Sequence, residues 1–166
     1  MVGSADAGYG NHALKLRVLA VGRRQPSWVE EAVAEYTKRM PKRSPIEVVS
    51  VRPAGHGNRD QVRTAEADRL LGLVNPADLV VALDETGKQW DTKALAERFT
   101  QWHADGMQVT FFIGGAEGLA QRARDRAQHI WGLSKLTLPH GLARVVVVEQ
   151  LYRAWSLANS HPYHRG

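Results

Sequence analysis

Residues Gly114, Gly115 and Gly118 form a glycine-rich turn between an apolar stretch and a predicted helix. Glycine has no side chain, so a ligand can lie against the backbone, and the first amides of a helix beginning near Leu119 would be free to bind it. The turn lacks the spacing of a dinucleotide-binding G-x-G-x-x-G motif and the lysine of a P-loop. It therefore indicates either backbone contacts to a ligand or a tight strand-to-helix connection.

Basic and aromatic side chains gather towards the end of the chain. Such side chains hold phosphate groups and stack on unpaired bases, so they favour contact with nucleic acid. The alternative is a set of ordinary helix residues followed by a frayed tail. The residues are His140, Tyr152, Arg153, His161, Tyr163, His164 and Arg165.

The charge of the chain points to the same class of partner. Lysine and arginine number 22 against 17 acidic residues, a net charge of +5. Between Lys38 and Arg63 there are seven basic residues and only two acidic ones. A basic patch of this kind favours a polyanion, because neutralising phosphates releases their counterions. A basic surface with no such partner is the alternative.

Other chemistries find little support in the sequence. The chain has no cysteine, which excludes disulfides, thiolate metal sites and cysteine nucleophiles. His161 and His164 have a spacing of three, but they lie in a proline-containing tail without a third ligand, so we expect no metal. There is no G-x-S-x-G motif, and the pair Asp84 and Glu85 is more typical of a solvated turn than of an acid/base dyad.

Apolar strands that alternate with amphipathic helices would position these residues. Ser27 and Glu30 have the spacing of a capping box at the start of the first helix. Strands are predicted at 16–21, 46–51, 79–83, 109–113 and 133–138, and helices at 27–40, 62–73, 95–102, 119–130 and 142–159. This order predicts an α/β fold, a mostly parallel sheet with helices on both faces.

In such a sheet, ligands bind beyond the carboxyl ends of the strands. Three polar turns are predicted at that edge, at residues 84–88, 114–118 and 139–141. The glycine-rich turn is thus expected to be one of three segments around a common binding site.

The length of 166 residues fits a single domain with its own core. Residues 1–13 are rich in small and polar residues and are predicted to be a disordered extension, which leaves 14–166 as the domain. No apolar run reaches the roughly 20 residues of a membrane span, and no signal peptide is recognisable. Together with the lack of cysteine, this favours a cytoplasmic protein.

Seven short segments in fixed order resemble the ribosomal large subunit methyltransferase H family, the small single-domain SPOUT enzymes. The resemblance runs from about Lys15 to Arg165. The segments lie at 16–22, 83–84, 112–118, 133–140, 144–145, 149–153 and 162–165. Each is weak alone, but their order and spacing make the resemblance specific.

The resemblance implies a SPOUT domain whose C-terminal trefoil knot binds S-adenosylmethionine, and a homodimer built around that knot. Members of the family methylate N3 of a pseudouridine in large-subunit (23S) rRNA and act on assembled ribosomes. Two alternatives remain: a SPOUT enzyme with another RNA target, and a non-catalytic RNA- or ribosome-binding module.

The resemblance also implies which residues bind the cofactor. Backbone groups of Leu133, Leu136 and Leu138 would hold the adenine edge, with apolar side chains beside it. The full set is Leu83, Gly114, Gly115, Leu133, Ser134, Lys135, Leu136, Thr137 and Leu138.

For catalysis, the candidates are His140, Tyr152, Arg153, His164 and Arg165. Methyl transfer to a ring nitrogen needs positioning and removal of a proton, and no metal. The arginines would grip phosphate or lower the proton affinity of the nitrogen. His140 or Tyr152 would orient the base or pass the proton, and the sequence does not decide between them.

Overall fold

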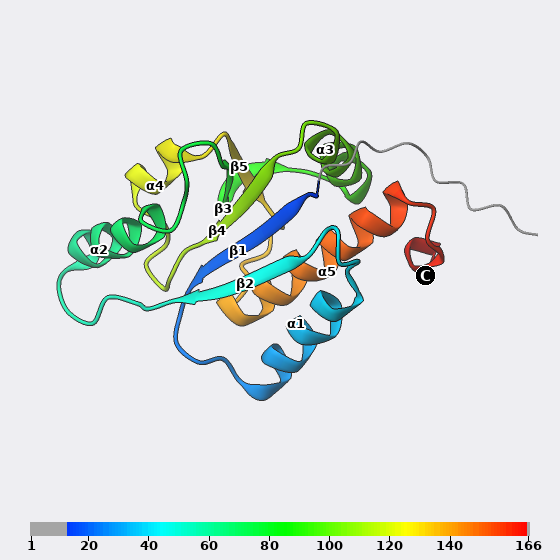
Figure 1. Ribbon diagram of the computed structural model, residues 1–166. Helices are drawn as coiled ribbons and strands as arrows, with labels where there is room; N and C mark the ends of the chain where they lie inside the picture. Colours follow the sequence, from blue (N-terminus) through cyan, green and yellow to red (C-terminus); the bar gives the residue numbers. More distant parts are fainter. Residues whose placement is uncertain (1–12, 166) are drawn as a thin grey trace, which may run out of the picture.

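The structure, a computed structural model, describes residues 13–165. The predicted disordered extension at 1–13 therefore lies outside the described residues except for Ala13. The described chain forms an α/β fold in which helices cover a sheet (Figure 1).

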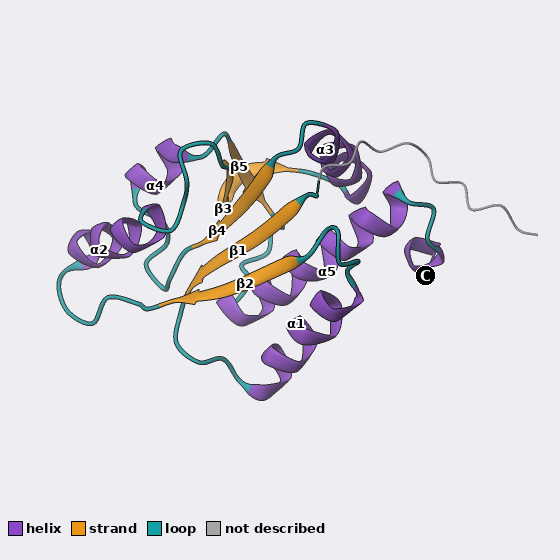
Figure 2. Cartoon of the chain, in the orientation of Figure 1, coloured by secondary structure: helices purple, strands orange, loops and turns teal. Residues whose placement is uncertain are grey.

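All five strands of the sheet are parallel, in the order β2-β1-β4-β3-β5 (Figure 2). The strands are β1 (Lys15–Val21), β2 (Ile46–Val51), β3 (Leu79–Gln89), β4 (Gln108–Ile113) and β5 (His129–Gly132). The predicted parallel sheet is confirmed, and the carboxyl ends of all strands meet at one edge.

The helices lie in two layers, one on each face of the sheet (Figure 1). The first layer contains α1 (Ser27–Arg39), α3 (Thr92–Ala104) and α5 (His140–Ala158), and the second contains α2 (Arg59–Leu71) and α4 (Gln121–Arg126). A short 3-10 helix, η1 (Pro162–Arg165), follows α5. Because α5 begins at the carboxyl edge of the sheet and runs antiparallel to the strands, its two ends lie at opposite edges.

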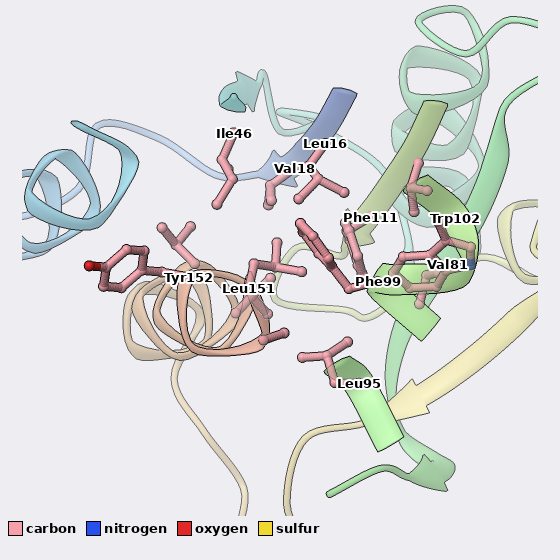
Figure 3. Close-up of a cluster of buried hydrophobic side chains, with 14 of the residues drawn as sticks. Leu16, Val18, Ile46, Val81, Leu95, Phe99, Trp102, Phe111, Leu151 and Tyr152 are labelled. Carbon is pink, nitrogen blue, oxygen red and sulfur yellow. The ribbon is translucent and has the colours of Figure 1, made fainter. Parts of the chain in front are cut away.

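The core reflects the alternation of side chains along buried strands. In β1, Val18 points towards the layer of α5, whereas Leu19 points towards α2. Phe111 and Phe112 in β4 divide in the same way, and all four side chains are fully buried. Figure 3 shows the larger cluster, in which Leu151 of α5 meets the sheet.

The prediction of a strand at 133–138 is wrong, since the fifth strand is β5 and residues 133–139 form an irregular loop. The predicted helix at 119–130 is correspondingly shorter. After α4, Gln128 donates its amide to Val80 O at 2.9 Å and accepts from Val80 N through its side chain at 2.7 Å. These two bonds draw the chain into the sheet, which places Ile130 in a strand although it has helical spacing.

The third strand is longer than predicted. Residues 84–88, expected to be a polar turn, belong to β3, but the ladder is interrupted there: Trp131 pairs with both Leu83 and Lys88. The intervening residues bulge out of the sheet. At Gly87, a Cβ atom would lie 2.6 Å from Gly132 N, so the close approach of β5 requires glycine.

The predicted capping box at Ser27 and Glu30 is also wrong. Pro26 is the N-cap of α1, and no side chain caps the helix, because proline fixes the backbone there without offering an acceptor. A true capping box is formed at α2, where the side chain of Asn58 accepts from Gln61 N and the Gln61 side chain accepts from Asn58 N.

Candidate active-site cleft

A cleft of about 330 Å³ lies at the carboxyl edge of the sheet. Three segments form its walls: the end of the regular part of β3 at 83–85, the turn after β4 at 113–119, and the loop between β5 and α5 at 133–140. The fold thus brings together three segments from the stretch 83–140 of the sequence (Figure 1). Each of these segments overlaps one of the three polar turns predicted for this edge.

Most of the residues expected to bind the cofactor line this cleft. They are Leu83, Gly114, Gly115, Leu133, Ser134, Leu136, Thr137 and Leu138, and they are joined by His140 at the start of α5. Lys135 is exposed and does not line the cleft.

The glycines of the turn are required by the packing of the protein itself. A Cβ atom at Gly114 would lie 2.9 Å from the carbonyl carbon of Gly118, and one at Gly115 would lie 2.9 Å from Glu66 Oε2. Gly118, with φ of +78°, closes the turn by donating to Gly115 O at 3.0 Å. The sequence suggested that these glycines let a ligand lie close to the backbone. In the structure, a side chain at Gly114 or Gly115 would instead point into the protein.

The side chain of Glu66 lies against the glycine-rich turn at Gly115. This carboxylate is only 4% exposed, although it comes from the exposed helix α2. Its Oε1 accepts from Ala54 N at 3.1 Å, and its Oε2 has no hydrogen-bond partner in the described part of the chain. Glu66 therefore joins the loop after β2 to the glycine-rich turn. The sequence offered no signal for this role beyond an acidic residue on an apolar helix face.

Two further ion pairs hold the rim of the cleft. Asp84, in the bulge of β3, accepts from Arg124 of α4 at 2.8 Å, and Glu117 in the glycine-rich turn pairs with Arg59 of α2 at 3.2 Å. Sequence reasoning treated Asp84 as part of a solvated turn, but its side chain is only 15% exposed. It fixes the bulge against α4.

The cleft combines apolar side chains with backbone groups. Trp131 is buried at its base, whereas Leu136 on the 133–139 loop is 75% exposed. The amide of Leu136 donates to Ser134 Oγ at 2.9 Å, which bends the loop locally. Clefts of this size and character bind flat organic ligands, with a few polar groups fixing their orientation.

The other predicted catalytic residues lie far from this cleft within one chain. Tyr152 comes twelve residues after His140 on α5, which corresponds to about 18 Å along the helix axis. Arg153 adjoins it, and His164 and Arg165 lie in η1 beyond the end of α5. A single chain therefore brings only His140 to the cleft.

These distant residues form an aromatic and basic cluster of their own, which we call the tail cluster: Tyr36, Tyr152, Arg153, Tyr163 and His164. The rings of Tyr152 and Tyr163 have centroids 4.6 Å apart. Arg153 donates to Glu149 at 2.8 Å, and Tyr163 Oη donates to the same carboxylate at 3.0 Å. His164 lies 3.3 Å from Ser156 Oγ through Nδ1. The end of the chain is thus packed against α5 rather than frayed.

Burial and hydrogen bonds fix the protonation states in the tail cluster. Burial is the largest cause that raises the pKa of Tyr163 well above its ordinary value, and hydrogen bonds to Tyr36 and Glu149 add to it. The hydrogen bond to Glu149 raises the pKa of Arg153. At neutral pH the cluster therefore presents a neutral phenol and a charged guanidinium.

Two negative findings concern residues 13–165. In this part of the chain, no group of three or more His, Cys, Asp or Glu side chains could hold a metal ion. None of the helices described there has both the length and the apolar character needed to cross a membrane.

Residues 14–164 match the family model described as "Predicted SPOUT methyltransferase". The chain belongs to the SPOUT methyltransferase family. It is a methyltransferase by this membership, and the family resemblance read from the sequence is confirmed.

Curated relatives cover nearly the whole SPOUT chain. A protein of Marinomonas sp. is 42% identical over 92% of this chain and 100% of its own length, and one of Methylobacillus flagellatus is 45% identical over 92% and 99%. Both are named ribosomal RNA large subunit methyltransferase H.

Solved structures show the same SPOUT fold at low sequence identity. A probable methyltransferase from Bordetella pertussis has a TM-score of 0.56 at 17% identity, covering 85% of this chain and 94% of its own. A probable methylase family protein from Haemophilus influenzae has a TM-score of 0.55 at 13% identity, covering 92% and 70%.

Proposed function

We propose that this protein is an S-adenosylmethionine-dependent methyltransferase that modifies N3 of a pseudouridine in 23S rRNA, acting on assembled ribosomes in the cytoplasm. The observation that carries the proposal is the cleft, because nearly all residues matched to the family's cofactor motifs come together there. The names of the full-length relatives support large-subunit rRNA as the substrate.

The size and the lining of the cleft support S-adenosylmethionine as its ligand. Its volume of about 330 Å³ lies at the lower end of the range for small-molecule sites. Leu133 and Leu138 would flank the adenine, and backbone groups of the 133–139 loop would bind its polar edge. The cofactor supplies an electrophilic methyl group on a sulfonium, so no metal is required for the transfer.

The protein must position the base and deal with its N3 proton. His140 is the only one of the five proposed catalytic side chains that lines the cleft. It is therefore placed to orient the target base or to accept the proton. Tyr152 is the alternative, but it is only 5% exposed and lies in the tail cluster.

A homodimer would complete the site. Since the tail cluster and the cleft lie at opposite ends of α5, Arg153, His164 and Arg165 would reach the target nucleotide in the cleft from a second subunit. The apolar side chain of Leu136, which lines the cleft and is 75% exposed, supports a partner there. A trefoil knot around the 133–139 loop is part of the proposal, as the family resemblance implies.

Two measurements test the proposed function. Calorimetric titration with S-adenosylmethionine should show binding, and its absence at millimolar cofactor would support the non-catalytic module instead. Mass spectrometry of 23S rRNA from a deletion strain should show a pseudouridine that has lost its N3 methyl group. Loss of a methyl group from a different RNA position would point to a SPOUT enzyme with another target.

A further inference from the structure

A second hollow, of about 400 Å³, lies beside the cleft between the end of β1, the loop after β2 and helix α2. Its walls carry Arg23, Arg52, His56 and Arg69, together with Pro53 and Gly55. The four basic side chains come from three separate parts of the chain. We call this feature the basic hollow.

No carboxylate lines the basic hollow within residues 13–165. None of its three arginines forms an ion pair in that part of the chain, whereas Arg59 at the neighbouring cleft is paired with Glu117 at 3.2 Å. Cations that converge without an acid repel one another, and an anion between them would relieve that repulsion.

One arginine of the hollow is held in place by the backbone. Arg69 donates from Nη1 to the carbonyl oxygen of Arg52 at 2.6 Å. The loop that follows is also fixed, because Ala54 N donates to the buried carboxylate of Glu66. The hollow is therefore a formed concave surface with donors on its walls, and guanidinium groups bind phosphate oxygens with two parallel hydrogen bonds.

The basic hollow and the cleft are close neighbours. His56 lines the hollow and Arg59 lines the cleft, so three residues of chain, at most about 10 Å, separate their Cα atoms. Glu66 contacts both sides: it holds Ala54 beside the hollow and lies under Gly115 in the cleft. In Figure 1 the loop between β2 and α2 projects at the carboxyl edge of the sheet, the edge at which the cleft lies.

We propose that the basic hollow binds a backbone phosphate of the RNA strand next to the nucleotide that enters the cleft. The proposal rests on the proposed function, since it takes RNA as the substrate. Phosphate contacts of this kind set the register of an RNA on a protein without reading its sequence. The hollow thus determines which nucleotide of the strand reaches the cofactor.

The decisive variant is Arg23→Gln combined with Arg52→Gln. Arg52 holds Arg69 through its backbone carbonyl, which the substitution leaves unchanged. The matched control is Lys15→Gln with Lys93→Gln, which removes the same charge from exposed positions outside the hollow and the cleft. Circular dichroism and S-adenosylmethionine affinity should be the same in both variants and in the parent.

RNA binding is measured with a labelled single-stranded RNA of mixed sequence at several potassium chloride concentrations. Each lost phosphate contact reduces the magnitude of the slope of log affinity against log salt by about 0.7, so the hollow variant, which loses one such contact, should lose about 0.7 relative to the control. On ribosomes lacking the modification, its KM should rise about tenfold with kcat unchanged. A slope and KM equal to those of the control would overturn the proposal.

Two further outcomes separate this proposal from other readings. If the parent protein binds RNA but methylates none, the proposed function is refuted. The comparison of salt slopes still tests whether the hollow binds a phosphate.

Titration with inorganic pyrophosphate tests for a free-anion site. Micromolar pyrophosphate affinity that does not compete with RNA would overturn the proposal, and weak competition that the hollow variant loses would support it.

Discussion

At the scale of single residues, Glu66 connects the cleft to its surroundings. It is buried, it holds the loop after β2, and one of its oxygens lies against the backbone of Gly115. Burying a carboxylate with one oxygen unpaired costs folding free energy, which suggests that the residue is kept for a specific role. Its role in this chain is to define the position of the glycine-rich turn.

Replacing Gly115 with alanine should therefore destabilise the protein. The new Cβ would lie 2.9 Å from Glu66 Oε2 and 3.1 Å from Val21 Cγ1. We expect a loss of about 1–3 kcal/mol in the free energy of unfolding, measured by urea denaturation, and weaker cofactor binding. Gly55→Ala is the control, because a Cβ there meets nothing within 4 Å.

The loss of unfolding free energy caused by Gly115→Ala should be smaller in a protein that already carries Glu66→Ala. A double-mutant cycle of Gly115→Ala and Glu66→Ala measures this coupling. Additive effects would mean that Val21 alone opposes the new methyl group.

His129 gives a prediction about pH. Burial, and to a smaller extent the positive charge of Arg98, lowers the pKa of its imidazole below the ordinary 6.5. Since the folded pKa is the lower one, protonation favours the unfolded chain. The contribution of His129 to stability is present above pH 6.5 and is lost as the pH falls through the folded pKa.

An NMR titration of the His129 ring measures that pKa directly. Arg98→Gln should raise it, although burial keeps it below the ordinary value. A pKa at or above 6.5 in the parent protein would contradict the partly buried position of this side chain.

At the scale of elements, the two helix starts α1 and α2 differ in a way that can be tested. Asn58→Ala removes a capping box and should cost about 1 kcal/mol of unfolding free energy. Ser27→Ala should change it by less than about 0.5 kcal/mol, because Ser27 caps nothing. Thermal or urea denaturation distinguishes them, and equal losses would mean that Ser27 does cap α1 in solution.

The strands with uniformly buried side chains were predictable from sequence, and the last strand was not. Val18 and Phe111 lie in apolar runs that only a sheet covered on both faces can bury. β5 has only four residues, and its place depends on the bonds between Gln128 and Val80, which no local pattern reveals. The segment from 133 to 138 was predicted to be a strand that ends at Pro139, but it forms a loop that borders the cleft, and Leu136 on it is exposed.

The candidate site shows the same division. Most of the residues expected from the family motifs line the cleft, whereas the polar groups that hold its walls were missed. Asp84 and Glu117 pair with arginines about 40 and 58 residues away, and such partners depend on the folded topology. The separation of His140 from Tyr152 followed from the predicted helix at 142–159, whereas the packing of Tyr36 and Tyr163 against Tyr152 depends on contacts between distant parts of the chain.

At the scale of the whole molecule, the proposed homodimer predicts activity from mixed subunits. His140→Ala should disable the cleft, and Arg153→Ala with His164→Ala should disable the tail cluster, so neither variant alone should methylate ribosomes. When the two variants are co-expressed and their subunits pair at random, half of the dimers are mixed, and each mixed dimer has one complete site out of two. The mixture should therefore recover roughly a quarter of the parental activity. A monomer by analytical ultracentrifugation, or no recovery on mixing, would contradict the shared site.

Strand β3 bulges between Leu83 and Lys88, which both pair with Trp131 of β5, and this bulge has a consequence for solubility. A sheet that does not close into a barrel has two open edges, and each can act as a template for strands of other molecules. Here one edge is β5, which is four residues long and pairs with an interrupted partner. An incoming strand would find too short a ladder to extend. The irregularity that shapes the cleft therefore also protects this edge of the sheet from aggregation.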